Sequence, residues 1–210
     1  MISPGIDEAE VRGLLDQVRA GNRGALDQLL AGHRSYLLSV VELRMDQKLR
    51  ARIDPSDVVQ EAQLEAAQRI EDYLRREPMP FQLWLRKTAY ENLLRLRRQH
   101  VEAGCRSVER EISLPDNSSA MLARKILSHE PNPGQQAIEQ ELALRLRQAL
   151  AQLPDIDAEV LLMRNLEGLT NQEVAQVLDI DPGATSKRYG RAIIKLRQLL
   201  LEGGLGDSRT

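Results

Sequence analysis

The stretch TNQEVAQVLDIDPGATSKRYGRAIIKLRQLL, from Thr170 to Leu200, predicts two short helices joined by a tight turn. Thr170 and Glu173 have the T-x-x-E spacing of a capping box, in which a hydroxyl and a carboxylate satisfy the free amide donors of a helix start. Pro182 is favoured at the first position of a new helix, and Asp181 before it is a suitable cap. The second helix should therefore begin at Pro182.

The second helix, from Pro182 to Leu200, carries five cations and no acid. Such a helix can enter a major groove by its N-terminal turns, with Arg or Lys donating to guanine edges and other cations pairing with phosphates. The alternative is a solvated basic face on an ordinary hairpin of helices. Helical spacing predicts that Thr185, Tyr189, Ala192, Leu196 and Leu199 face inward and that Ser186, Lys187, Arg188 and Arg191 face outward.

Two residues of this stretch depart from the usual pattern. Asp179 occupies a turn position that favours glycine, and Gly190 inside the second helix costs about 1 kcal/mol relative to alanine. Both departures are compatible with a helix-turn-helix.

The composition predicts an all-α protein. The chain has 210 residues, 42% of them hydrophobic and only 3% aromatic, which suits helices packed through Leu, Ala and Val in one large or two small domains. No apolar run approaches the roughly 20 residues that cross a bilayer, and the N-terminal segment is unlike a signal peptide, so we expect a cytoplasmic protein without membrane insertion.

The sequence contains no recognisable catalytic or metal-binding motif. Cys105 is the single cysteine, and the three histidines are scattered. The chain has no G-x-x-x-x-G-K-S/T loop, no H-E-x-x-H and no G-x-S-x-G. We therefore expect no enzyme, no cofactor, no metal and no small-molecule substrate.

The formal net charge of −2 is unusual for a protein that binds nucleic acid, because phosphate contacts favour a positive surface. The distribution of charge resolves this conflict. Acids gather in residues 54–77 and 139–167, whereas cations gather in residues 86–98 and in the last helix. A chain divided in this way can contact DNA with some faces and a protein partner with others.

The N-terminal half predicts several helices. Asp54-Pro55-Ser56-Asp57 combines a cap, a proline at the first helical position and a carboxylate in the first turn, so a helix should run from there to about Leu74. Other helices are expected at about 7–19 and 23–50. After the interruption at Pro78-Met79-Pro80, an apolar stripe consists of Phe81, Trp84, Leu85, Thr88, Ala89, Asn92, Leu93 and Leu96, with Arg86, Lys87, Arg97 and Arg98 off it.

Periodicity fades between residues 101 and 136, where glycine, proline and polar residues dominate and one short helix is expected at 120–127. We interpret this segment as a flexible linker. The predicted organisation is two small helical domains, residues 1–100 and 137–210, with further helices at 138–151 and 156–166 before the helix-turn-helix.

Three segments together resemble the bacterial RNA polymerase sigma factors of the extracytoplasmic-function (ECF) class. DPSDVVQEAQLEAAQRIEDY is similar to the core-binding helix of the family's region 2, and PFQLWLRKTAYENLLRLRRQ to the helix that follows it and melts promoters. LPDIDAEVLLMRNLEGLTNQEVAQVLDI with the basic helix is similar to region 4. The resemblance implies a factor that directs core RNA polymerase to specific promoters and aids promoter melting.

The resemblance also implies site residues. In the family the helix carrying Asp57, Gln60 and Glu61 docks on the polymerase; the alternative is an acidic turn that only complements the helix dipole. The loop and helix after it capture flipped bases of the minus-ten element, for which the candidates are Tyr73, Arg75, Arg76, Lys87 and Tyr90. The recognition-helix candidates are Ala184, Ser186, Lys187, Arg188 and Arg191.

Within the minus-ten segment, Phe81 and Trp84 lie on the apolar stripe and are expected in the core, whereas Tyr90 lies off it and is the better stacking candidate. Glu91 and Arg95 stand where the family commonly has Asn and Asp, so the resemblance does not extend to the promoter sequence. Core RNA polymerase and promoter DNA are the implied partners, and an anti-sigma protein is a further candidate.

Two other functions are compatible with parts of the sequence. A dimeric helix-turn-helix regulator would bind a palindromic operator, but it leaves the D-x-V-Q-E segment unexplained. A helical interaction protein that does not bind DNA would make the basic helix incidental.

Overall fold

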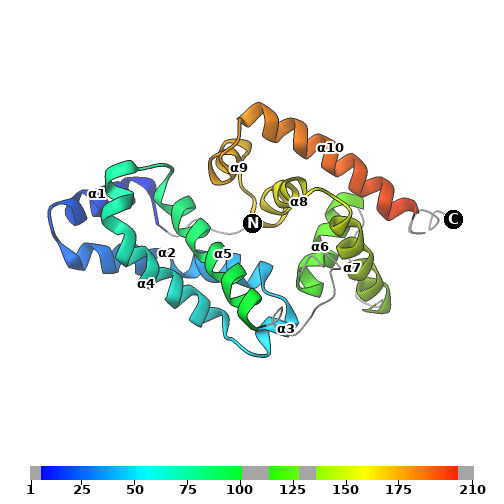
Figure 1. The fold of residues 1–210 in the computed structure, drawn as a ribbon, viewed down its shortest axis with the longest axis horizontal. Coiled ribbons are helices and arrows are strands. Elements are labelled where there is room, and N and C mark those ends of the chain that lie inside the picture. The colour runs from blue at the N-terminus through cyan, green and yellow to red at the C-terminus, as the bar shows by residue number, and fades with distance from the viewer. Residues whose placement is uncertain (1–5, 101–113, 128–135, 203–210) are drawn as a thin grey trace. The chain divides into compact units, whose positions relative to one another are not determined.

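The computed structural model describes residues 6–100, 114–127 and 136–202. These residues form helices and no strand, as the composition predicted, and the chain divides into two compact units, Ile2–Arg106 and Ser107–Thr210. Figure 1 shows the helices of each unit. In the described residues, none of the helices combines the length and apolarity needed to span a lipid bilayer.

The N-terminal unit is built on three long helices. Its helices are α1 (Glu8–Arg19), α2 (Arg23–Arg44), α3 (Gln47–Arg50), α4 (Pro55–Arg76) and α5 (Phe81–His100). Helices α2, α4 and α5 pack against one another, and α1 packs against α2. The core between them is dominated by Leu, Val and Ala side chains, as expected for a chain with few aromatics.

The predicted start of α4 is confirmed. Asp54 Oδ1 accepts a hydrogen bond from the Ser56 amide at 2.7 Å, and Pro55 occupies the first helical position. Hydrogen bonds from the Ser56 hydroxyl and, second, from the Ser56 amide lower the pKa of the exposed Asp54 carboxyl, because the charged form is the better acceptor. The segment expected to be helical at 23–50 is divided into two helices, because α2 ends at Arg44 and Asp46 caps a separate α3 through the Leu49 amide at 3.0 Å.

The apolar stripe of α5 is confirmed in full, because all eight of its members are buried. Phe81 and Trp84 pack with Tyr73 of α4 and His33 of α2 in an aromatic cluster, with the Tyr73 and Trp84 ring centroids 4.7 Å apart. Burial lowers the pKa of His33, whose Nδ1 lies 2.8 Å from the Leu29 carbonyl oxygen. This cluster joins the three long helices next to the loop that precedes α5.

The C-terminal unit contains α6 (Asp116–Leu127), α7 (Gln136–Ala151), α8 (Asp155–Leu162), α9 (Asn171–Leu178) and α10 (Pro182–Leu200). A short π-helical turn, η2 (Met163–Glu167), follows α8. Helix α6 packs on α7, and α10 packs on α7, α8 and α9. The turn η2 replaces the last residues of the helix expected at 156–166.

Helix α6 lies in the segment expected to be a linker. It begins at Asp116, before the predicted start at 120, and its apolar side is buried. Arg147 of α7 pairs with Asp116, and Arg197 Nε of α10 donates to the Ile126 carbonyl oxygen at 2.8 Å. The remaining residues of the expected linker, 101–113 and 128–135, lie outside the described residues. The described part of this segment is thus a packed helix.

Candidate nucleic-acid interface

Helices α9 and α10 form the helix-turn-helix that the sequence predicted. Both halves of the capping box are present: the Glu173 amide donates to Thr170 Oγ1 at 3.2 Å, and the Thr170 amide donates to Glu173 Oε2 at 2.6 Å. Asp179 ends α9 in the left-handed region, with φ 54° and ψ 50°. Asp181 then caps α10 by accepting from the Ala184 amide at 3.0 Å.

A side-chain hydrogen bond joins the two helices, and a second one lies within the first turn of α10. Asn171, the first residue of α9, donates through Nδ2 to Ser186 Oγ on α10. Thr185 is fully buried, and its hydroxyl donates to the Asp181 carbonyl oxygen at 3.2 Å. The expected inward face of α10 is confirmed for Thr185, Ala192 and Leu196, which are buried, whereas Tyr189 and Leu199 are half-buried.

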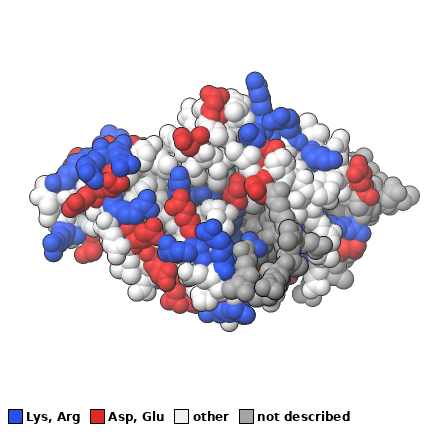
Figure 2. All heavy atoms as spheres, viewed as in Figure 1, with Lys and Arg blue, Asp and Glu red and all other residues white. Residues whose placement is uncertain are grey.

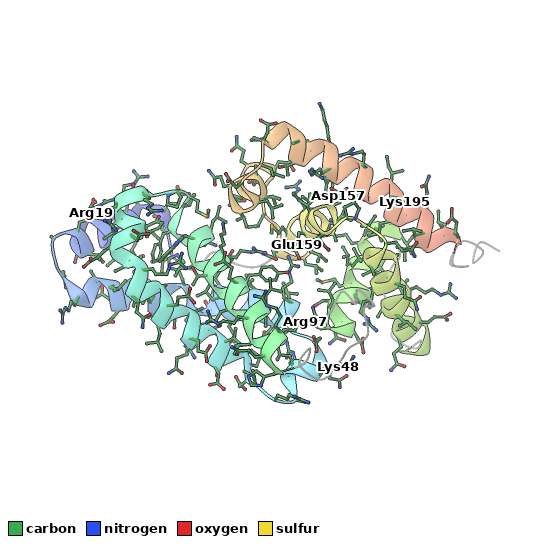
Figure 3. The ribbon with its side chains drawn as sticks, viewed as in Figure 1. Arg19, Lys48, Arg97, Asp157, Glu159 and Lys195 are labelled. Carbon is green, nitrogen blue, oxygen red and sulfur yellow. The ribbon has the colours of Figure 1, made fainter. Side chains whose placement is uncertain are left out.

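The outer face of α10 is cationic. Ser186, Lys187 and Arg191 are exposed as predicted, and Ala184 is half-buried beside them. Figure 2 shows Lys and Arg side chains gathered along this helix, and Figure 3 labels Lys195 further along it. Exposed amines and guanidinium groups in this arrangement suit contacts with phosphates and guanine edges.

One exposed residue of this face was missed by the sequence reasoning. Ile194 is 60% exposed, three residues after Arg191 on the same side of the helix. An apolar side chain there suits contact with a thymine methyl group or with the sugar backbone. Helical spacing could have identified Ile194, because a residue three positions after Arg191 lies on the same face of the helix.

Arg188 does not behave as predicted. We expected it to face outward, but its Nη1 donates to Asp157 Oδ1 of α8 at 2.8 Å. The Asp157 side chain is only 12% exposed, and that of Arg188 is 32% exposed. Burial of its partner draws the guanidinium toward α8, so the structure groups Arg188 with the contacts that hold α10 in place.

The N-terminal unit presents the three predicted polymerase-binding residues on one face. Asp57, Gln60 and Glu61 are exposed on the outer side of α4, and Leu64 beside them is 58% exposed. These residues recur at three- and four-residue steps, so they share a face. Leu64 adds an apolar side chain to this acidic face, and the sequence analysis did not single it out.

The predicted minus-ten residues fall into two groups. Arg75 and Arg76 at the end of α4 are exposed, each paired with Asp72, and Lys87 on α5 is half-buried. Tyr73, in contrast, is 5% exposed, and its hydroxyl donates to the Met79 carbonyl oxygen at 3.1 Å. Tyr73 is therefore a core residue that supports the loop before α5, and its ring is not available to stack on a base.

Tyr90 is half-buried, and the guanidinium groups of two buried arginines lie near its ring. The guanidinium carbons of Arg44 and Arg86 lie 5.1 Å and 5.0 Å from the centroid of its ring. The prediction that Arg86 falls on the polar side of α5 is wrong, because its side chain is 1% exposed. Cation–π contacts with Tyr90 help to stabilise both buried charges.

Comparison with protein families identifies the helix-turn-helix. The model of sigma-70 region 4 matches residues 143–196, from α7 into the last turns of α10. Residues 143–196 are therefore similar to sigma-70 region 4. The match includes both helices of the motif and α8, which carries Asp157, whereas α6 and the N-terminal unit lie outside it.

Two further similarities extend beyond region 4. The chain is 30% identical over 147 residues to the probable RNA polymerase sigma factor RfaY of Xanthomonas campestris pv. campestris, over 70% of this chain. It spans about a third of that relative, 34% of its length. The solved structure of CnrH in complex with the cytosolic domain of CnrY covers 95% of this chain and 99% of that chain, with a TM-score of 0.55 and 23% identity. The likeness to CnrH therefore concerns the fold.

Proposed function

We propose that this chain is a sigma factor of the ECF class. It binds core RNA polymerase, directs it to specific promoters and aids the opening of the minus-ten region. In this proposal the chain has no catalytic chemistry of its own, because bond formation belongs to the polymerase.

The main support for the proposal is that the segment similar to region 4 folds as a helix-turn-helix. The match at residues 143–196 includes a capping box on α9, a tight turn at Asp179 and an exposed cationic face on α10. We propose that α10 enters the major groove of the minus-thirty-five element, where Lys187 and Arg191 donate to bases or phosphates. Ser186 and Ala184 lie close enough on the helix to contribute.

The N-terminal residues 1–100 supply the other two functions in this proposal. The face of α4 with Asp57, Gln60 and Glu61 docks on core RNA polymerase, where carboxylates can pair with basic side chains. Leu64 gives this face an apolar contact that a purely solvated acidic turn does not need. The similarity to RfaY supports this assignment.

Minus-ten recognition is proposed for the cations around the loop before α5. Arg75 and Arg76 are exposed at the end of α4, and Lys87 is accessible on α5. They can hold the backbone of an unpaired strand. Tyr90 is half-buried and stays the stacking candidate, whereas the burial of Tyr73 restricts it to supporting the loop.

An anti-sigma protein is a further proposed partner. CnrH was solved in complex with the cytosolic domain of CnrY. Such a partner would compete with core polymerase for this chain.

Co-elution with core RNA polymerase tests the proposal. The purified chain is mixed with core enzyme and separated by size-exclusion chromatography. We expect a complex of one chain per core enzyme that withstands physiological salt. Failure of the chain to co-elute, together with dimerisation in solution, would instead favour the helix-turn-helix regulator.

A further inference from the structure

Asp157 and Arg188 connect α8 to α10 inside region 4. They are 31 residues apart in sequence, and their side chains meet at 2.8 Å in a hydrogen-bonded ion pair. Asp157 stands in the first turn of α8, and Figure 3 labels it there. The pair is thus a direct electrostatic link between the helix that packs under α10 and α10 itself.

The position of Arg188 around α10 separates it from the other cations. A helix turns by about 100° per residue, which sets Arg188 about 100° from Lys187 and about 60° from Arg191. Lys187 and Arg191 are exposed, whereas Thr185 and Ala192 are buried on the opposite side. Arg188 lies at the boundary between these two faces, on the side that α8 covers.

The burial of Asp157 makes the pair costly to break. A carboxylate with 12% exposure depends on its partner, because an unpaired buried charge is poorly solvated. If Arg188 turned toward DNA, it would leave this carboxylate unpaired. The exposed Lys187 and Arg191 can reach phosphates without that cost.

Building on the proposed function, we propose that Arg188 is a positioning residue that clamps α10 to α8 through Asp157 and makes no contact with DNA. The clamp fixes the orientation in which α10 presents Lys187 and Arg191 to the groove. Of the cations on the first three turns, only Lys187 and Arg191 then contribute to the release of counterions from DNA.

The salt dependence of DNA binding distinguishes a positioning residue from a phosphate contact. The probe is a pool of random 30-base-pair duplexes, titrated with the full-length chain at several salt concentrations at a temperature where each variant is folded. Loss of one phosphate contact lowers the magnitude of the negative slope of log K against log salt by about 0.9. We expect Lys187→Gln to show this loss, and Arg188→Gln to leave the slope unchanged while affinity falls roughly tenfold at fixed salt.

Three further variants test the link to Asp157. Asp157→Asn should reproduce the effect of Arg188→Gln, because it removes the same pair from the other side. The double variant should bind no more weakly than the weaker single variant. Arg188→Lys should recover most of the affinity, since an ammonium group can still pair with the carboxylate.

The outcomes separate this proposal from the proposed function. If Arg188→Gln and Lys187→Gln reduce the magnitude of the slope equally, Arg188 contacts phosphate, and the clamp would be wrong while the function stands. Tighter binding by Asp157→Asn would also overturn it, because the carboxylate would then compete with DNA. If no cation variant changes the slope, α10 does not bind duplex DNA and this part of the proposed function fails. The clamp is then tested by urea unfolding of Arg188→Gln, Asp157→Asn and the double variant. Losses of unfolding free energy that simply add in the double variant would contradict the clamp.

Discussion

Gly190 lies in the middle of α10, where an added Cβ would meet no atom within 4 Å. Glycine inside a helix costs conformational entropy that alanine avoids. We predict that Gly190→Ala raises the free energy of unfolding of the C-terminal unit by about 1 kcal/mol. Amide hydrogen exchange across α10 measures this gain, since the single tryptophan, Trp84, reports on the N-terminal unit.

A second glycine of α10 provides a matched control. A Cβ at Gly183 would lie 2.9 Å from Asp181 Oδ1, the atom that caps the helix. Gly183→Ala should therefore give no gain. Equal slowing of exchange in both variants would contradict the structural reason given for Gly190.

Tyr73 links the aromatic cluster to the loop before α5. Burial raises the pKa of its phenol to about 12, because the phenolate would be poorly solvated. The neutral form is thus favoured in the folded state, and the stability this gives is fully present below the unfolded pKa of about 10 and is lost as the pH rises through about 12.

We predict that Tyr73→Phe costs about 1 kcal/mol at neutral pH, because the hydrogen bond to the Met79 carbonyl oxygen is lost. The difference in stability between wild type and variant should shrink between pH 10 and 12. Urea unfolding followed by Trp84 fluorescence at pH 8 and pH 11 measures it. A difference that stays constant across this range would contradict the buried, neutral phenol.

Single residues also show which side-chain environments the sequence predicted and which it did not. Helical spacing correctly assigned Phe81 and Trp84 to the core, because periodicity follows apolar side chains. It assigned Arg86 and Arg188 to the surface, yet both have partners within the fold, Tyr90 and Asp157 respectively. These partners become visible only when the helices are packed, so spacing along one helix does not predict them.

At the scale of elements, the sequence predicted both the turn between α9 and α10 and the unfavourable residue in it, Asp179. Asp179 adopts φ 54°, a conformation that favours glycine because other residues crowd their own backbone there. We predict that Asp179→Gly stabilises the C-terminal unit by about 1 kcal/mol. Hydrogen exchange in α9 and α10 measures the change, and faster exchange would contradict the inferred strain.

At the start of α9, a substitution in the capping box is predicted to destabilise the helix. Thr170→Ala removes the acceptor for the Glu173 amide and should cost about 1 kcal/mol. The same exchange measurement applies, with Thr170→Ser as the control, because serine keeps the hydroxyl. An unchanged α9 in the alanine variant would show that tertiary packing alone maintains the helix start.

The exposed face of α4 carries a prediction about the partner. Glu61→Lys should weaken binding to core RNA polymerase by at least about tenfold, because it reverses a charge at the proposed interface. Its stability should stay within about 0.5 kcal/mol of wild type, since the side chain is exposed. Fluorescence anisotropy with labelled chain measures the affinity. Glu10→Lys on α1 makes the same charge change elsewhere, and equal loss in both variants would contradict a specific face.

The helix boundaries show which sequence signals were sufficient to predict where a helix begins or ends. The cap at Asp54 and the capping box at Thr170 identified helix starts, because these residues satisfy backbone amides locally. The break between α2 and α3 at Asp46 was missed, since no glycine or proline marks it. The π-helical turn after α8 was missed as well, because the apolar pattern continues through it.

At the scale of the whole molecule, the net charge of −2 is an average over two units with different exposed charges. The carboxylates of α4 lie on an exposed face of the N-terminal unit, and the exposed cations of α10 lie in the C-terminal unit. The sequence predicted this division and the all-α fold. It did not predict that α6 packs on α7, because the segment around it reads as polar and irregular.

Transcription in vitro tests the central claim most directly. Core RNA polymerase is incubated with the purified chain and genomic fragments of its source, and the 5′ ends of the transcripts are mapped. We expect start points that depend on the chain, and fewer transcripts from them when Lys187 and Arg191 are both changed to alanine. Transcripts whose start points are the same with and without the chain would contradict the claim.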